Sequence, residues 1–271
     1  MKSEFGNFFH INLSGFGLTL LVRRILGAGF LLFFLTSPIN AFDLENLSSD
    51  EKTVFGELVK EYLLNNPEIL LDVIERLQEQ ENEANLERDR GFIESFADEI
   101  FHDPNSWVGG NPEGEINLVE FIDYRCGYCR NSQQVIEDII DTNSDLRLVV
   151  REFPILGEQS DISSRLAIAV FQLAGPEQYK MIHDFLLSLE GPVSEKVISE
   201  VAEMTSLDLQ DLMDKMVDSS VMDVLDTNYQ LAQALEINAT PTFILGTKII
   251  RGFLTSEEFQ YELDQLETTT N

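Results

Sequence analysis

The sequence predicts an α/β fold that is preceded by an N-terminal helical extension. Two observations predict it: a strand, a helix and another strand follow one another over residues 116–153, and after a long helical stretch two short strands and a helix close the chain. A third is the composition, because 44% hydrophobic residues among 271 are enough for a sizeable core. The predicted order is therefore β-α-β, a helical block, and β-β-α.

Residues 1–41 are predicted to be a signal peptide. The apolar run at 25–35 follows two arginines and leads to a small residue, Ala41, after which cleavage is expected. The alternative is a transmembrane helix over residues 16–35, but that helix would place both arginines near the middle of the bilayer, where each costs roughly 2.5–3.5 kcal/mol. We therefore expect an exported, periplasmic protein.

Residues 42–77 are predicted to be an N-terminal helical oligomerisation segment. A capping box of Ser48 and Glu51 begins a first helix, and Asn66 with Pro67 begins a second. Apolar residues at helical spacing lie on one face of each helix: Phe55, Leu58, Val59 and Tyr62, then Leu70, Val73, Ile74 and Leu77.

Two such short amphipathic helices cannot bury their apolar faces by themselves. They can pack onto the main domain of the same chain, or they can pair with copies of themselves. Residues 78–104 are predicted to be a charged helical linker with little to bury, which favours separation from the main domain. We therefore expect a homo-oligomer.

The main domain is predicted over residues 105–267. A strand, a helix and a second strand form the unit that joins two parallel strands. The expected elements are, in order, a strand over 116–122, a helix from Cys126, a strand over 146–153, a helical insertion over about 158–236, strands over 242–245 and 248–253, and a final helix that the capping pattern of Thr255 and Glu258 begins.

The strong negative charge limits the possible partners. The chain has 18 Lys and Arg against 48 Asp and Glu, which gives a net charge of −30. Neutralising phosphates needs clustered Lys and Arg, and an anionic membrane surface attracts basic segments. The composition therefore excludes a general nucleic-acid binder, and we expect no nucleic acid among the partners.

The two cysteines of the chain, Cys126 and Cys129, form a CGYC motif where a strand gives way to a helix. A structural disulfide would close a loop of four residues, which is worth only about 2 kcal/mol. A closed zinc site needs four ligands, and residues 42–271 add only His102 and His183, neither at ligand spacing. His183 is better interpreted as packing at the edge of a helix, and we expect no metal site.

The third interpretation, a redox dithiol, is the one that we favour. At a helix N-terminus the free N–H groups and the helix dipole stabilise a thiolate, which is the nucleophilic form. Cys126 would attack a disulfide, and Cys129 would resolve the mixed disulfide. Glu120, on the incoming strand, would accept the Cys129 proton if burial raises the pKa of its carboxyl group. The alternative for Glu120 is an ordinary charge at a strand edge.

Three segments resemble, in the same order, the DsbA-like branch of the thioredoxin superfamily: EFIDYRCGYC at 120–129, REFPILG at 151–157 and ATPTF at 239–243. The segments that flank the CGYC motif, together with YLLNNPE at 62–68, resemble the ScsC and Com1-type subgroup of exported thiol-disulfide oxidoreductases, whose members associate through an N-terminal helical extension. The resemblance implies a thioredoxin fold with a helical insertion, and no cofactor.

For the individual residues, local sequence does not mark the Thr240–Pro241 bond as special, but the resemblance implies that it is cis. It also implies that this loop lies against the cysteines, where its backbone pairs with an extended substrate segment. It favours Glu120 as the buried acid. Gly127 and Tyr128 tune the thiolate and its redox potential. Gly-Tyr is the dipeptide of the DsbC-type isomerases, which also have Thr before the cis proline, whereas DsbA oxidases typically have Pro-His.

These observations together predict a periplasmic thiol-disulfide oxidoreductase with isomerase character. It would act on unfolded or misfolded exported proteins and be kept reduced by a membrane reductant of the DsbD or ScsB kind. The alternative is a DsbA-like dithiol oxidase, kept oxidised by a DsbB-like partner. A further alternative is a copper-binding periplasmic protein, because thiolates suit Cu(I) and ScsC-like proteins are associated with copper stress, although two sulfurs make a thin site.

Overall fold

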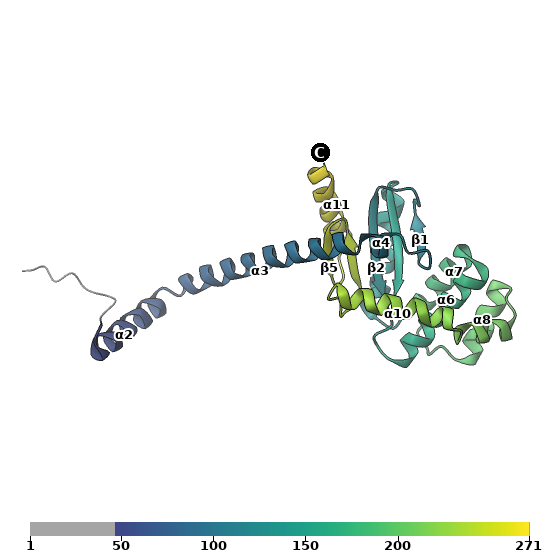
Figure 1. Cartoon of the computed structure of the whole chain (residues 1–271), viewed down its shortest axis with the longest axis horizontal. Helices are drawn as coiled ribbons and strands as arrows, with labels where there is room; N and C mark the ends of the chain where they lie inside the picture. Colours follow the sequence, from purple (N-terminus) through teal and green to yellow (C-terminus); the bar gives the residue numbers. More distant parts are fainter. Residues whose placement is uncertain (1–46, 271) are drawn as a thin grey trace, which may run out of the picture. The chain divides into compact units, whose positions relative to one another are not determined.

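The computed structural model describes residues 47–270, so the predicted signal peptide lies outside the described residues. In this range, no helix is both long enough and apolar enough to cross a membrane. Figure 1 shows the elements, which are, in chain order, α2 (Ser49–Asn65), α3 (Glu68–Ser95), α4 (Ala97–Phe101), β1 (Trp107–Gly110), β2 (Ile116–Ile122), α5 (Gly127–Thr142), β3 (Leu146–Glu152), α6 (Glu158–Ala174), α7 (Pro176–Ser188), α8 (Glu195–Thr205), α9 (Leu209–Met216), α10 (Ser219–Ala234), β4 (Thr242–Leu245), β5 (Lys248–Arg251) and α11 (Ser256–Thr270).

The chain divides into two compact units, and the first ends at Val73. Helix α2 of this unit begins with the predicted capping box: the Glu51 amide donates to Ser48 Oγ, and the Ser48 amide donates to Glu51 Oε2. No residue of α2 is buried. The predicted apolar face is therefore exposed within this unit, with between 40% and 60% of each side chain accessible: Phe55, Leu58, Val59 and Tyr62.

The second unit, from Ile74 onwards, contains one five-stranded sheet in the order β1-β3-β2-β4-β5. Strands β2 and β3 are parallel, as the β-α-β pattern predicts, and the other neighbours are antiparallel. Strand β1 was not predicted, because its four residues include two glycines and show no clear alternation. It pairs with β3 alone and forms one edge of the sheet.

The two faces of the sheet carry separate parts of the core, because successive residues of a strand point to opposite faces. On one face, Leu118 and Ile122 of β2 join Leu148 and Val150 of β3 in the larger cluster, which also contains residues of α5 and of the helical insertion. On the other face lie Val119, Phe121 and Val149, with residues of α4 and α10. The sheet is thus covered on both faces.

The last turns of α3 belong to the core of this second unit. The carboxylate of Asp89 is buried and accepts two hydrogen bonds from Arg251 of β5, at 2.8 and 3.1 Å. Ile93 is buried in the same region. The predicted linker over 78–104 is therefore helical up to Ser95 and again in α4, and its second half packs on the domain. The pair of Asp89 and Arg251 was not predicted, because the two residues are 162 positions apart and no local pattern joins them.

Candidate active site

The cysteine pair lies at the start of α5, as the sequence predicts. Cys126 is the N-cap residue, its backbone is extended, and its amide donates to the carbonyl oxygen of Asp123 at 3.0 Å. Both cysteines are free thiols. Cys126 retains 7% of its surface, whereas Cys129, one turn into the helix, retains none. The two sulfurs therefore differ in access: Cys126 lies at the surface end of the helix, and Cys129 is enclosed.

The Thr240–Pro241 loop lies against the first cysteine. The bond is cis, as the resemblance implies. The Cys126 thiol donates a hydrogen bond to the carbonyl oxygen of Thr240 at 3.1 Å. The sheet accounts for this contact, because β4 runs antiparallel to β2 and its first residue, Thr242, pairs with Phe121 near the end of β2. The loop before β4 and the loop after β2 consequently meet at the same end of these two strands.

Gly127 and Tyr128 lie on the outside of the site. Nothing would touch a Cβ atom at Gly127, and 64% of Tyr128 is exposed. The Tyr128 ring lies 6.5 Å, centre to centre, from the ring of Phe253. The chain just before Phe253 is tied to the loop, because the Gly252 amide donates to the carbonyl oxygen of Pro241 at 3.0 Å. An exposed tyrosine, next to a partly buried phenylalanine, thus lies beside the first cysteine.

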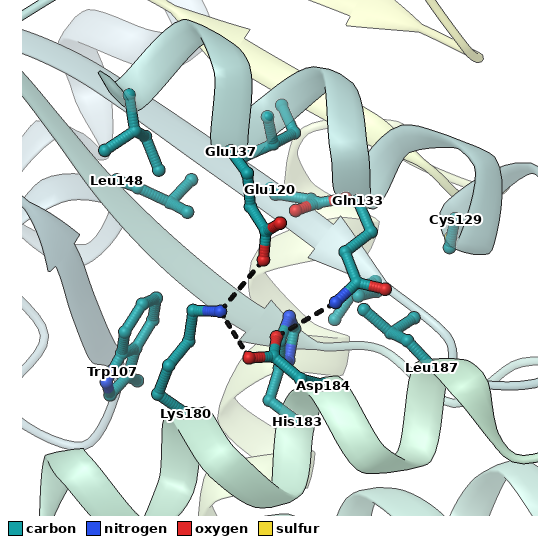
Figure 2. A pocket seen from close by; sticks show the side chains of 13 residues that line it. Trp107, Glu120, Cys129, Gln133, Glu137, Leu148, Lys180, His183, Asp184 and Leu187 are labelled. Atoms are coloured by element: carbon teal, nitrogen blue, oxygen red, sulfur yellow. Dashed lines mark hydrogen bonds and ion pairs between the residues drawn. The ribbon is translucent and has the colours of Figure 1, made fainter.

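Glu120 points into the core, not to a strand edge. It is 4% exposed and lines a cavity of about 30 Å³ that Cys129 also lines (Figure 2). Burial raises the pKa of Glu120 to about 8, and the charge of Glu152 adds to this effect. Burial also raises the pKa of the Cys129 thiol, with the charge of Glu120 as the second cause. The carboxyl group that sequence analysis selected is therefore buried beside the second cysteine.

A cluster of charged side chains closes the outer wall of this cavity. The ammonium group of Lys180, on α7, lies 3.1 Å from the carboxylate of Glu137 on α5 and 2.5 Å from that of Asp184. Gln133 donates to the same Asp184 carboxylate at 3.0 Å (Figure 2). These side chains are partly exposed. The cavity beside Glu120 and Cys129 is thus bounded by the helical insertion as well as by α5.

A second buried carboxylate, Glu152, was not identified from the sequence as a site residue. It accepts hydrogen bonds from the hydroxyl groups of Tyr124 and Tyr179, both at 2.6 Å, and of Ser164 at 2.7 Å. Burial raises the pKa of Glu152 to about 7, although the three hydrogen bonds act in the opposite direction. Glu152 and Tyr124 lie in the segments that carry the resemblance, but two of the donors belong to the insertion, which local patterns do not place.

His183 is buried among aromatic rings, so the interpretation that it packs at the edge of a helix was only partly right. It is 6% exposed, its Nδ1 lies 3.1 Å from the hydroxyl of Tyr124, and its ring stacks near Trp107 and Tyr179. Burial lowers the pKa of His183 to about 3, and the positive charge of Lys180 contributes. Within residues 47–270, no group of three or more His, Cys, Asp or Glu side chains could hold a metal ion.

Asp123 connects the loop before the cysteines to the loop after β3. One carboxylate oxygen accepts the amides of Ile155 and Leu156 at 2.9 and 3.0 Å, and the other accepts the amide of Arg125 at 2.8 Å. This carboxylate is fully buried. Because both loops are held by one side chain, the backbone that presents Cys126 has a defined position relative to the sheet.

Two family models match the chain. The model described as "Thioredoxin" matches residues 102–265, which include the cysteines, Glu120 and the Thr240–Pro241 loop. The model described as "Copper resistance protein ScsC N-terminal domain" matches residues 51–84, which include most of α2 and the first part of α3.

Several solved structures are similar to the chain. A thioredoxin-like oxidoreductase from Silicibacter pomeroyi DSS-3 is 35% identical, covers 63% of this chain and 97% of its own, and has a TM-score of 0.58. The thiol-disulfide exchange protein alpha-DsbA2 from Wolbachia pipientis is 25% identical, with 68% and 98% covered and a TM-score of 0.62. A linker-deletion variant of Proteus mirabilis ScsC is 22% identical, with 85% and 99% covered and a TM-score of 0.62, and at that identity it shows the fold alone.

The curated relatives are longer than the matched segment. The Na(+)/H(+) antiporter NhaA 3 of Salinispora tropica is 23% identical over 139 residues, which are 51% of this chain and 21% of that protein. The chain therefore spans about a fifth of the length of the curated relatives that it matches.

Proposed function

The chain belongs to the thioredoxin family, as a DsbA-like protein of the ScsC type, and on this premise we propose that it exchanges thiols and disulfides in exported proteins and has disulfide isomerase character. The observation that carries the proposal is the arrangement of Cys126, which lies at the surface end of α5 against the Thr240–Pro241 loop, with Cys129 enclosed behind it. This arrangement supports one attacking and one resolving sulfur.

The first step uses Cys126. Its thiolate, stabilised by the N-terminus of α5, attacks one sulfur of a substrate disulfide. A mixed disulfide forms between Cys126 and the substrate, the substrate S–S bond breaks, and the second substrate sulfur leaves with the electron pair as a thiolate. The Thr240–Pro241 loop provides backbone groups beside the reacting sulfur for an extended substrate segment.

The mixed disulfide has two ways to resolve. In isomerisation, another thiolate of the substrate attacks the substrate sulfur, a different substrate disulfide forms, and Cys126 leaves as the thiolate. In reduction, Glu120 first releases its own proton to water, its carboxylate then takes the proton of the Cys129 thiol, and the Cys129 thiolate attacks Cys126. The substrate sulfur leaves as a thiolate, and a Cys126–Cys129 disulfide remains. The second route requires a dithiol reductant, for which we propose a membrane protein of the DsbD or ScsB kind.

Three features support isomerase character over a simple oxidase. The dipeptide between the cysteines is Gly127-Tyr128, the residue before the cis proline is Thr240, and the chain has an exposed apolar face on α2. That face, within the segment matched by the ScsC N-terminal model, supports assembly of several active sites around one substrate. A periplasmic location follows from the predicted signal peptide.

Reactivation of scrambled, fully oxidised ribonuclease tests the proposal. Residues 42–271, in a glutathione buffer, should restore ribonuclease activity, and Cys126→Ala should abolish the effect because it removes the attacking sulfur. A protein that oxidises a reduced peptide but does not reactivate scrambled ribonuclease would be an oxidase. A protein that does neither would contradict the proposed thiol-disulfide exchange.

A further inference from the structure

Glu152 is a buried charged group that the thiol chemistry above does not use. It lies at the end of β3, on the same face of the sheet as Glu120. The register of the parallel strands establishes this, because Glu120 pairs with Val150 and Ile122 pairs with Glu152, and residues two apart on a strand share a face. Both carboxyl groups therefore enter the core that α5 and the insertion cover.

Hydroxyl groups from three different elements hold the Glu152 carboxylate. Tyr124 donates from the loop before the cysteines, Ser164 from α6 and Tyr179 from α7, all within 2.7 Å. Three short hydrogen bonds to a carboxylate favour its ionised form. Among residues 47–270, no lysine or arginine forms an ion pair with Glu152. When Glu152 is ionised, three hydroxyl hydrogen bonds stabilise its negative charge, but no positive side chain in this part of the chain neutralises it.

The groups around the two carboxyls leave this charge without an opposing one. The cavity beside Glu120 is lined by other polar groups, namely Cys129, Glu137, Lys180, His183 and Asp184. The positive charge of Lys180 is already shared by two carboxylates, and His183 is neutral because burial lowers its pKa to about 3. Tyr124 and Tyr179 lie beside Glu152, and burial raises the pKa values of both. Asp123 is also near, and its negative charge raises the pKa of Glu152.

We propose that Glu152 is a positioning residue for the protons of this site: when its buried carboxylate is ionised, this charge adds to burial in keeping the proton on Glu120 near neutral pH. The inference rests on the proposed function. When a thiolate of the reductant attacks Cys126 in the Cys126–Cys129 disulfide, a mixed disulfide forms between the reductant and Cys126, the Cys126–Cys129 bond breaks, and Cys129 leaves as a thiolate. The proton then moves from Glu120 to Cys129, and water returns a proton to Glu120. The charge of Glu152 is the second cause, after burial, of the raised pKa of Glu120.

An infrared titration of the full chain tests the inference, because a protonated carboxyl group has a C=O stretching band that ionised carboxylates lack. Glu120→Gln identifies the band of Glu120. In Glu152→Gln, the midpoint of that band should move to lower pH by about one unit, since a nearby like charge is removed. Glu137→Gln is the matched control: it also removes a carboxylate from the cavity wall, but one that is partly exposed and paired with Lys180, so its shift should be much smaller.

Ser164→Ala provides a second test that leaves both carboxyl groups in place. It removes one donor to Glu152, so the Glu152 midpoint should rise and the Glu120 midpoint should fall. Unchanged midpoints for Glu120 in both Glu152→Gln and Ser164→Ala would overturn the inference. The spectra need no substrate. If the protein shows these shifts but does not reactivate ribonuclease, the proposed function is wrong and the coupling between Glu120 and Glu152 stands. If it reactivates ribonuclease but shows no shifts, the coupling is wrong and the proposed function stands.

Discussion

The thiol of Cys126 donates a hydrogen bond to the carbonyl oxygen of Thr240 at 3.1 Å, although the two residues are 114 positions apart in the chain. The entire helical insertion lies between them in sequence. They meet because β4 pairs with β2, so that the loop before one strand adjoins the loop after the other. The sheet thus brings together the sulfur that is proposed to attack and the loop that is proposed to bind substrate.

The difference in access between the two sulfurs predicts which variant traps a substrate. Cys129→Ala should accumulate a mixed disulfide through Cys126, because the sulfur that resolves it is absent. Mass spectrometry of the protein after incubation with a disulfide-bonded peptide would show the added mass, which dithiothreitol should remove. Cys126→Ala should show no adduct. Equal trapping through either cysteine would contradict the assigned roles.

The raised pKa of Glu120 predicts how stability depends on pH. Burial and the charge of Glu152 raise this pKa to about 8, whereas a glutamate in the unfolded chain titrates near about 4.3. Between these values the folded state holds a proton that the unfolded state releases, so the stabilisation is complete below about pH 4.3 and is lost as the pH rises through 8.

Glu120→Gln removes this titration. From pH 5 to pH 9, the free energy of unfolding of the wild type should therefore fall by about 4 kcal/mol more than that of Glu120→Gln. Urea unfolding at the two pH values measures the difference. Glu115→Gln, which changes an exposed glutamate just before the same strand, is the control and should follow the wild type. A Glu120→Gln curve parallel to the wild type would mean that Glu120 is already ionised at pH 5.

His183 predicts the opposite behaviour in acid. Burial lowers its pKa to about 3, with Lys180 contributing, while an unfolded histidine titrates near about 6.5. Below that value the unfolded state takes up a proton that the folded state does not, so stability is lost as the pH falls from about 6.5 toward 3. Between pH 7 and pH 4.5, the free energy of unfolding of His183→Gln, measured in urea, should fall by about 2.5 kcal/mol less than that of the wild type. His102→Gln, an exposed histidine, should make no difference.

The exposed apolar face of α2 predicts that single charges disrupt self-association. Leu58 is 58% exposed in the chain and Phe55 46%, and an interface between copies would bury both. Leu58→Asp should therefore convert a multimer of residues 42–271 to the monomer mass in light scattering, because an unpaired buried charge is costly. Lys60→Asp, on the opposite side of the same helix, should leave the mass of the multimer unchanged. A monomer for the unaltered chain would refute the predicted homo-oligomer.

The contact between Asp89 and Arg251 predicts that α3 loosens from the domain when one partner is changed. Asp89 is buried, with its side chain 3% exposed, and it receives both hydrogen bonds of the guanidinium group. Asp89→Asn should lower the free energy of unfolding by about 1–2 kcal/mol and increase hydrogen exchange in the last turns of α3. Glu87→Gln breaks only an exposed pair with Arg90, so it should change the free energy of unfolding by less than about 0.5 kcal/mol.

Much of the architecture could be predicted because it rests on local patterns. The apolar run over 116–122 coincides with β2, the CGYC motif lies at the start of α5, and the capping patterns at Ser48 and Thr255 begin α2 and α11. A strand, a helix cap and a reactive pair at fixed spacing each depend on residues a few positions apart. Strand β1 escaped prediction because its short glycine-containing sequence becomes a strand through its hydrogen bonds with β3.

The sequence by itself determined where the two sulfurs lie on a helix, and it predicted the carboxyl group on the incoming strand that lies beside Cys129. Only the tertiary structure decided that Glu152 joins Glu120 in the core, because its hydroxyl donors arrive from the loop before Cys126, from α6 and from α7. It also decided that Asp89 docks α3 on β5 across 162 positions. Local periodicity reports which face of an element is apolar, whereas a buried polar group is satisfied by partners that packing alone brings together.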